Sequence, residues 1–480
     1  MVVQNIIFWG LALILLFIPL PYGAVDEWAI FLFETTTFVL FSLHLVHSLI
    51  RTTSSKSSEG RKFDPGSQRA GEKQTLMDPP LKILLAVFFV FSFIQITPLP
   101  SSFLNILSPR VADIQKGWGT LSFSPNLSVY EFLKYICYFL FAYLLIKYVG
   151  TKRHVEILIL VIIASAVFQS FYGLTEYFSG SGKIFGWKNI WSKGPALGAF
   201  GTFVNRNHFS GFLEMVLPVS LGYLLTKTNF FSMKRGLSWR EKILLFVQDR
   251  LPKVIILGSI SILLGLGILF SRSRSGLLIF FMTIFLMFLS LSLGEGRNEK
   301  VHHPRRFTKI MRAVVLVVLF SILFLGMLPI LEKFTRGPLP SRVGRPFYYK
   351  NTLKIIAHYP LFGTGLGTFA YVYPKFKDQF DTGFLDHAHN DYLEMLAESG
   401  FIGGLPIILA AFAGVFFLFR RWLKKHDDFK RGIMLGCLAG ITAILIHSAT
   451  DFNLRIPANA VYFVTLFALG FRVANLKTRS

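Results

Sequence analysis

The chain has 480 residues, of which 53% are hydrophobic, 16% aromatic and only 16% charged. Soluble domains carry about 25% charged residues, so this composition excludes an ordinary soluble protein and indicates an integral membrane protein. The formal net charge of +24 would suit a nucleic-acid-binding protein. However, the basic residues concentrate in alternate loops between apolar segments, as the positive-inside rule requires of multi-pass membrane proteins. We therefore expect a lipid bilayer as partner and no nucleic acid.

Apolar segments of about 20 residues, long enough to cross a bilayer, recur along the chain. They predict an all-α polytopic fold of about twelve helices, forming a single membrane domain over residues 1–480 with both termini cytoplasmic. The first segment lacks a basic n-region and a cleavage site, which favours a retained helix over a signal peptide. The expected spans are 3–21, 27–50, 81–97, 129–148, 155–177, 208–226, 253–270, 276–293, 313–331, 401–419, 432–449 and 458–473.

Two longer polar segments interrupt these spans. Residues 51–80 are rich in Ser and Gly and end in a Pro-Pro pair, which predicts a flexible cytoplasmic loop. Residues 332–400 form the longest extramembrane segment, a large loop that the alternation of helices places on the periplasmic side. Within it, the apolar spacing of residues 347–357 predicts an amphipathic helix. The glycine-rich stretch 363–367 lacks the βαβ context of a dinucleotide-binding loop, so we expect a flexible turn there.

Several arginines fall on the predicted outer side, where the positive-inside rule gives no reason for them. They are therefore candidates for binding an anion. The two cysteines fall inside predicted helices, so we expect neither a disulfide nor a metal framework from them. The outer arginines are Arg206, Arg272, Arg274, Arg336, Arg342, Arg345 and Arg455, and the cysteines are Cys137 and Cys437.

A polar island at residues 386–391, with the sequence DHAHND, precedes an apolar segment. Polar groups at a membrane edge are costly unless they have a function. Asp391 with Glu394 fits a capping box and Gly400 suits the position after a helix C-terminus, which predicts a short helix over 392–399. His389 would lie just before its N-terminus, where the helix dipole attracts anions and disfavours a protonated imidazole. A neutral His389 beside a phosphorylated substrate is suited to act as a general base.

Other interpretations of this island stay open. His387 and His389 could merely form hydrogen bonds at the membrane interface. A His-x-His pair with flanking aspartates can also ligate zinc, although the sequence offers no clear spacing for the remaining ligands. If one histidine is a base, His387 could share or replace the role of His389.

The island also carries a family resemblance. His389, Asn390, Gly400 and Gly403 have the spacing of a signature of the O-antigen ligases, which form a broader family with O-antigen polymerases. Further stretches resemble family motifs in the same order along the chain, and together they indicate an O-antigen ligase-like core at residues 195–460. These stretches are 200–208, Ser273–Gly276, Gly344-Arg345 with 358–367, and His447–Phe452.

The resemblance implies a GT-C-like membrane glycosyltransferase in the bacterial inner membrane, with its active site facing the periplasm. The donor would be a glycan linked to undecaprenyl diphosphate, and the acceptor a hydroxyl of a lipid A-core sugar or another glycan. The implied alternative is a polymerase that joins lipid-linked repeats. Transfer of the glycan to a protein is a weaker alternative. A transporter is also a weaker alternative, because ionisable residues are nearly absent from helix centres and the two halves show no matching broken helices.

Residue by residue, the resemblance gives His389 the role of catalytic base, with His387 as its competitor. Arg274 and Arg345 would hold the diphosphate, and Arg206 would be a third contact. Arg272 competes with Arg274, Arg342 competes with Arg345, and Asn390 joins the substrate-binding set. The family mechanism needs no metal and no cofactor, and the lack of an Asp-x-Asp pair on the outer loops fits this expectation.

Overall fold

The computed structural model describes residues 2–58, 78–113, 117–188, 198–227, 251–295, 344–378 and 384–476. The predicted span at 313–331 lies outside the described residues, as does most of the predicted loop at 51–80. Arg336 and Arg342 also lie outside them, so their predicted roles stay predictions.

Among the described residues, ten helices are long and apolar enough to cross a membrane, and each coincides with a predicted span. The apolar helix α1 is shorter, at Val2–Phe17. The prediction of an all-α, polytopic membrane protein is therefore confirmed. The ten helices are α2 (Glu27–Ser58), α3 (Pro79–Ile96), α6 (Pro125–Tyr148), α7 (Lys152–Ser179), α8 (Arg206–Lys227), α10 (Leu251–Ser271), α11 (Arg274–Glu295), α15 (Asp391–Leu423), α16 (Asp428–His447) and α17 (Pro457–Ala474).

Local sequence explains many of the helix ends. α3, α6 and α17 each begin with proline, whose missing N–H is no loss in the first turn. Thr151 caps α7 by accepting a hydrogen bond from His154 N at 3.2 Å. Gly180 then ends the same helix with a φ of 65°, a conformation that glycine adopts without penalty.

α8 and α16 form the centre of the bundle, and both are largely buried. Small residues allow their backbones to approach closely, as is common between membrane helices. A Cβ atom on Gly222 of α8 would lie 2.4 Å from the carbonyl oxygen of Gly432 of α16, and one on Gly440 would lie 2.4 Å from that of Met215. α10 packs against α8, while α17 lies between α16 and α6. The two helices run antiparallel, so the start of α8 and the end of α16 are held next to each other.

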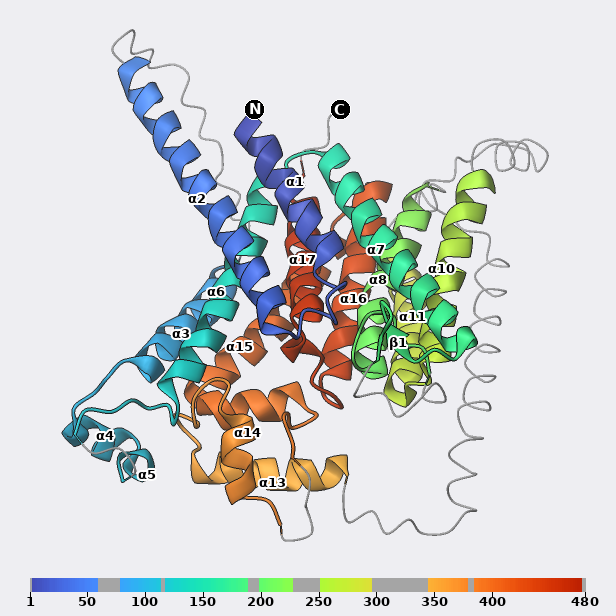
Figure 1. Ribbon diagram of the computed structural model, residues 1–480. Helices are drawn as coiled ribbons and strands as arrows, with labels where there is room; N and C mark the ends of the chain where they lie inside the picture. The colour runs from blue at the N-terminus through green and yellow to red at the C-terminus, as the bar shows by residue number, and fades with distance from the viewer. Residues whose placement is uncertain are drawn as a thin grey trace, which may run out of the picture.

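The two marked termini lie at one end of the bundle, and α13 (Arg345–His358) and α14 (Phe369–Val372) lie at the other (Figure 1). α13 confirms the amphipathic helix predicted at 347–357, and it runs across the bundle end beneath α15. A short antiparallel ribbon, β1 (Lys183–Ile184) with β2 (Trp187–Lys188), is the only sheet within the described ranges.

The predicted helix at 392–399 is the first part of α15. Gly400 has φ 58° and ψ −171° and so interrupts the helical backbone, but the chain continues as a helix to Leu423. The glycine-rich stretch 363–367 is a turn, as predicted, but it is packed into the fold. It is buried against this kink, where Thr364 N donates to Ala397 O at 3.1 Å and Gly365 N donates to Glu398 O at 2.8 Å. The predicted loop at 51–80 was also too long, since α2 extends to Ser58 and α3 begins at Pro79.

Candidate active site

His389 lies just before the N-terminus of α15, as predicted, but the capping residue was misassigned. Asn390 is the N-cap, because its Oδ1 accepts hydrogen bonds from Tyr392 N and Leu393 N at 3.0 Å each. Asp391 instead accepts a hydrogen bond from Leu454 N through Oδ2 at 3.0 Å. Asn390 Nδ2 also donates to Ala449 O at 2.8 Å. Asn390 therefore joins α15 to the segment after α16, and this structural role competes with the predicted one in substrate binding.

The backbone of His389 has a φ of 52°, which is uncommon for a residue other than glycine. Such a conformation persists only where the surroundings hold it. Here Tyr349 of α13 donates a hydrogen bond from its hydroxyl to His389 O at 2.9 Å. The imidazole itself is held by the carboxylate of Asp451.

Asp451, in the connection between α16 and α17, holds the imidazole of His389. The distance from His389 Nδ1 to Asp451 Oδ1 is 2.9 Å, and the aspartate side chain is fully buried. Its other oxygen, Oδ2, accepts from Arg345 Nη2 and from Asn207 Nδ2, both at 2.7 Å. Burial alone would raise the pKa of Asp451, but the bond to His389 and the nearby positive charges outweigh it and hold the pKa below its ordinary value. An ionised Asp451 favours a proton on Nδ1 of His389, which leaves Nε2 as a proton acceptor.

His387 is bound to a different carboxylate. Its Nδ1 lies 2.8 Å from Glu394 Oε1, while Glu394 Oε2 accepts from Ala388 N at 2.7 Å. The ring of Phe452 contacts both imidazoles, with centroid distances of 4.3 Å to His387 and 4.9 Å to His389. The two histidines are therefore held by different carboxylates but share one aromatic neighbour. In the described part of the chain, no group of three His, Cys, Asp or Glu side chains is placed to hold a metal ion.

Several of the predicted arginines meet beside this site. Arg345, in the first turn of α13, lies 3.4 Å from Ser275 Oγ in addition to its bond to Asp451. Ser275 follows Arg274 at the start of α11. Arg206, at the start of α8, lies within electrostatic reach of Arg272 and Arg274. Three helices thus bring like charges together at one edge of the site, an arrangement that attracts an anion.

The prediction that Arg455 belongs to this anion-binding set was wrong. Its guanidinium is buried, with Nη2 2.7 Å from Glu398 Oε2 and Nε 3.2 Å from Glu394 Oε1. Glu131 of α6 lies further away, at 3.9 Å from Nη1. These carboxylates neutralise the arginine, so it holds α15 and α6 together.

Sequence reasoning also missed ionisable groups inside the bundle. Glu214 of α8 and His447 of α16 form a fully buried pair, with 3.0 Å between Oε2 and Nδ1. Ser210 donates to the other glutamate oxygen at 2.7 Å, and a Cβ on Gly276 would lie 1.9 Å from Ser210 Oγ. Glu214 is thus an ionisable residue inside α8, whereas His447 is the last residue of α16. The pair supports the start of α11, which carries Arg274.

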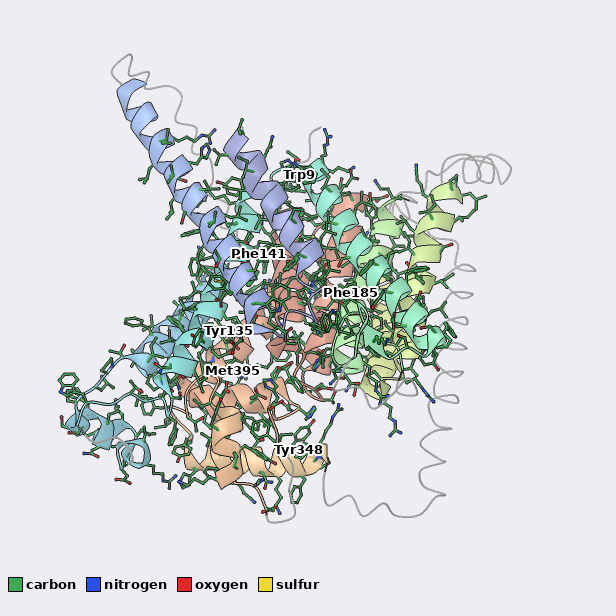
Figure 2. The ribbon with its side chains drawn as sticks, viewed as in Figure 1. Trp9, Tyr135, Phe141, Phe185, Tyr348 and Met395 are labelled. Atoms are coloured by element: carbon green, nitrogen blue, oxygen red, sulfur yellow. The ribbon has the colours of Figure 1, made fainter. Side chains whose placement is uncertain are left out.

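An apolar cavity of about 700 Å³ lies beside the first turns of α15. Its walls come from α3, α6, α15, α16 and α17, and its polar lining includes Asp391 and Arg455 next to the site and Lys82 and Lys147 on α3 and α6. Figure 2 shows Tyr135 and Met395, two of its lining residues, close to each other above α13, which carries Tyr348. A cavity of this size and polarity suits a hydrocarbon chain.

Part of the chain is similar to a known protein family. Residues 259–408 match the family model described as O-antigen ligase. The matched range contains Arg274, Arg345 and His389, whereas Asp451 follows it. No curated protein matches the chain.

Proposed function

We propose that the chain, whose residues 259–408 match the family model described as O-antigen ligase, is a metal-independent glycosyltransferase with a GT-C-type architecture. It moves a glycan from an undecaprenyl-diphosphate carrier to a hydroxyl group of a lipid A-core sugar. The observation that carries the proposal is the hydrogen-bonded group of His389, Asp451 and Arg345. This group places a proton acceptor and a phosphate-binding guanidinium on the two oxygens of one carboxylate.

In the proposed reaction, His389 Nε2 takes the proton from the acceptor hydroxyl as its oxygen attacks the anomeric carbon of the donor glycan. The bond from that carbon to the diphosphate oxygen breaks, and the carrier diphosphate leaves with the electron pair. Asp451 stabilises the imidazolium that forms. Arg345, Arg274 and Arg206 hold the negative charge of the leaving group, for which guanidinium groups offer paired hydrogen bonds.

The sidedness of the molecule supports a periplasmic site. The helix ends near the two marked termini carry basic residues such as Arg420, Arg421, Lys430 and Arg431, and α13 with the site lies at the opposite end (Figure 1). The positive-inside rule places the basic end in the cytoplasm. The donor and acceptor of such a ligase would therefore meet on the outer face of the bacterial inner membrane.

The apolar cavity supports a lipid-linked substrate, and it can be tested separately. Ala411 lines the cavity, whereas Ala413 on the same helix does not. Ala411→Trp should fill the cavity and raise the KM of a lipid-linked substrate, while Ala413→Trp should leave the KM unchanged. Equal effects of the two substitutions would show that the cavity holds no substrate chain.

Purified protein in lipid nanodiscs, supplied with lipid-linked donor and lipid A-core acceptor, tests the function directly. A ligase forms capped lipid A-core and continues to do so in EDTA. Inactivation by EDTA that added Mg²⁺ or Zn²⁺ reverses would contradict the metal-independent mechanism. Donor incubated alone distinguishes the alternative, because a polymerase would lengthen the lipid-linked glycan without any acceptor. In a deletion strain, loss of capped long chains with accumulation of lipid-linked polymer marks a ligase.

A further inference from the structure

His387 is part of a buried group of charged side chains that the proposed reaction does not use. Its Nδ1 lies 2.8 Å from Glu394, which in turn lies 3.2 Å from Arg455. Arg455 also bonds to Glu398 at 2.7 Å and lies 3.9 Å from Glu131. The three carboxylates come from α6 and α15 and point towards the short connection that carries Arg455. We call these five residues the charged cluster.

The charges of this cluster do not balance when His387 is neutral. When all three are ionised, Glu131, Glu394 and Glu398 contribute three negative charges. Arg455 and Lys134, whose Nζ lies 2.5 Å from Glu131 Oε1, contribute two positive charges. A buried charge without a partner is costly. A proton on His387 supplies the missing positive charge, and the buried carboxyl of Asp391 nearby can only add to the negative side.

The other groups near His387 do not prevent its protonation. The neighbouring His208 is buried and has no hydrogen bond to its Nε2, and His389 is bound to Asp451. Burial alone would lower the pKa of His387, but the charge and hydrogen bond of Glu394 outweigh burial and Arg455, and the pKa lies above its ordinary value. Phe452 stacks on the His387 ring at 4.3 Å, a favourable position for a cation.

We propose that His387 is an imidazolium that binds an anionic phosphate oxygen of the substrate, while His389 works as the neutral base. Glu394 occupies Nδ1 of His387, so Nε2–H is the donor left for the substrate. The imidazole side chain is 32% exposed, whereas that of Glu394 is 1% exposed, so the charge reaches the surface of the site although its partner does not. This inference rests on the proposed function for the identity of the phosphate, which we assign to the donor diphosphate.

The affinity for P1,P2-dimethyl diphosphate, measured by calorimetry, tests whether a protonated His387 binds phosphate. This measurement requires no glycan transfer. The charge of this diester stays constant between about pH 5 and 9 because it has no proton to lose in that range. Wild-type protein should bind it about tenfold more weakly at high pH than at neutral pH, as His387 loses its proton. His387→Gln should bind weakly at both, and His387→Arg should bind tightly at both. His358→Gln, at the far end of α13, is the matched control and should behave as wild type.

Transfer kinetics then show whether His387 binds a phosphate of the donor or of the acceptor. The KM of the donor should rise at alkaline pH in wild-type protein and stay flat in His387→Arg. If the KM of the acceptor changes instead, the phosphate belongs to the acceptor, and our assignment to the donor is wrong. Glu394→Gln should move the alkaline loss of affinity to lower pH, because it removes the carboxylate that favours the proton.

Two results would overturn the inference. One is wild-type affinity for the diester that does not depend on pH, and the other is His387→Gln with wild-type affinity at neutral pH. Either result can occur while transfer remains normal, in which case only the role of His387 is lost. A protein that binds the diester as expected but transfers no glycan would instead contradict the proposed function.

Discussion

His389 and Asp451 are joined by a hydrogen bond of 2.9 Å between Nδ1 and Oδ1, although 62 positions separate them in the chain. This bond fixes the orientation of the imidazole and favours the tautomer in which Nε2 can accept a proton. The residue that we propose as the base thus depends on a partner from the connection between α16 and α17.

The first prediction is that Asp451→Asn is nearly inactive. An amide can hold the ring in either tautomer and cannot stabilise an imidazolium, so kcat should fall by about 10²- to 10⁴-fold. The partly exposed Asp378, which pairs with Lys354 at 2.6 Å, provides the control, and Asp378→Asn should transfer glycan normally. Wild-type turnover by Asp451→Asn would mean that this carboxylate only supports the fold.

The second prediction concerns the base itself. His389→Ala should lose about 10²- to 10⁴-fold in turnover while it still binds the lipid-linked donor. His389→Asn should fail as well, because an amide cannot take up a proton. In wild-type protein the rate should fall at acid pH, since a protonated His389 cannot accept another proton. Transfer assays with purified components measure this, and a dead His387→Ala beside an active His389→Ala would reverse the two roles.

The third prediction is that arginines hold the diphosphate. Arg345→Ala and Arg274→Ala should each lose about 3 kcal/mol of transition-state stabilisation, a loss of about 10²-fold in kcat/KM. Lysine at either position should restore only part of the rate, because a point charge cannot form paired hydrogen bonds. Lys350→Ala on the exposed face of α13 is the control for a loss of charge alone. Equal activity of the alanine and lysine variants would contradict the assignment.

The fourth prediction concerns the kink in α15. Gly400 has a φ of 58°, and a Cβ atom there would lie 2.2 Å from Leu361 O. Gly400→Ala should therefore lower the free energy of unfolding by about 2 kcal/mol or more, seen as a lower melting temperature in detergent. Gly258→Ala in α10, where nothing lies within 4 Å of the added atom, should not lower the melting temperature. An unchanged melting temperature for Gly400→Ala would show that the kink can relax.

The fifth prediction concerns orientation in the membrane. A cysteine at Lys377, near α14, should react with an impermeant thiol reagent in intact cells, whereas a cysteine at Ser57, near the end of α2, should not. The native Cys137 and Cys437 are buried, so they should give little background. Labelling at residue 57 alone would reverse the assigned sides.

Hydropathy was sufficient to locate the membrane helices, because a span of apolar residues leaves the backbone few alternatives to a helix. The place of His389 before a helix was also predictable, since Asn390, Asp391 and Glu394 are all residues of a helix start. Which of them caps the helix was not predictable, because Asn and Asp are both good caps. The structure gives the cap to Asn390 and turns Asp391 towards Leu454.

The partners of the site residues were harder to predict. Asp451 lies in a stretch whose resemblance to the family was visible, but nothing local shows that it pairs with His389. Glu394 and Glu398 lie in an apolar helix and look like single polar interruptions, and only the fold brings Arg455 to both of them. The same contact explains why Arg455 was wrongly placed among the anion-binding arginines, since its neutralising acids are distant in sequence.

The position of Asp451 has a consequence for how the protein is made. Asn207, Arg345 and His389 all meet this one carboxylate, and each is synthesised before it. During insertion into the membrane, the earlier helices can therefore reach the bilayer while His389 still lacks the carboxylate that orients its imidazole. The site becomes complete only when the connection after α16 has left the ribosome and α17 has taken its place. A nascent chain that stops before this point carries the arginines and both histidines of the site but has no oriented base.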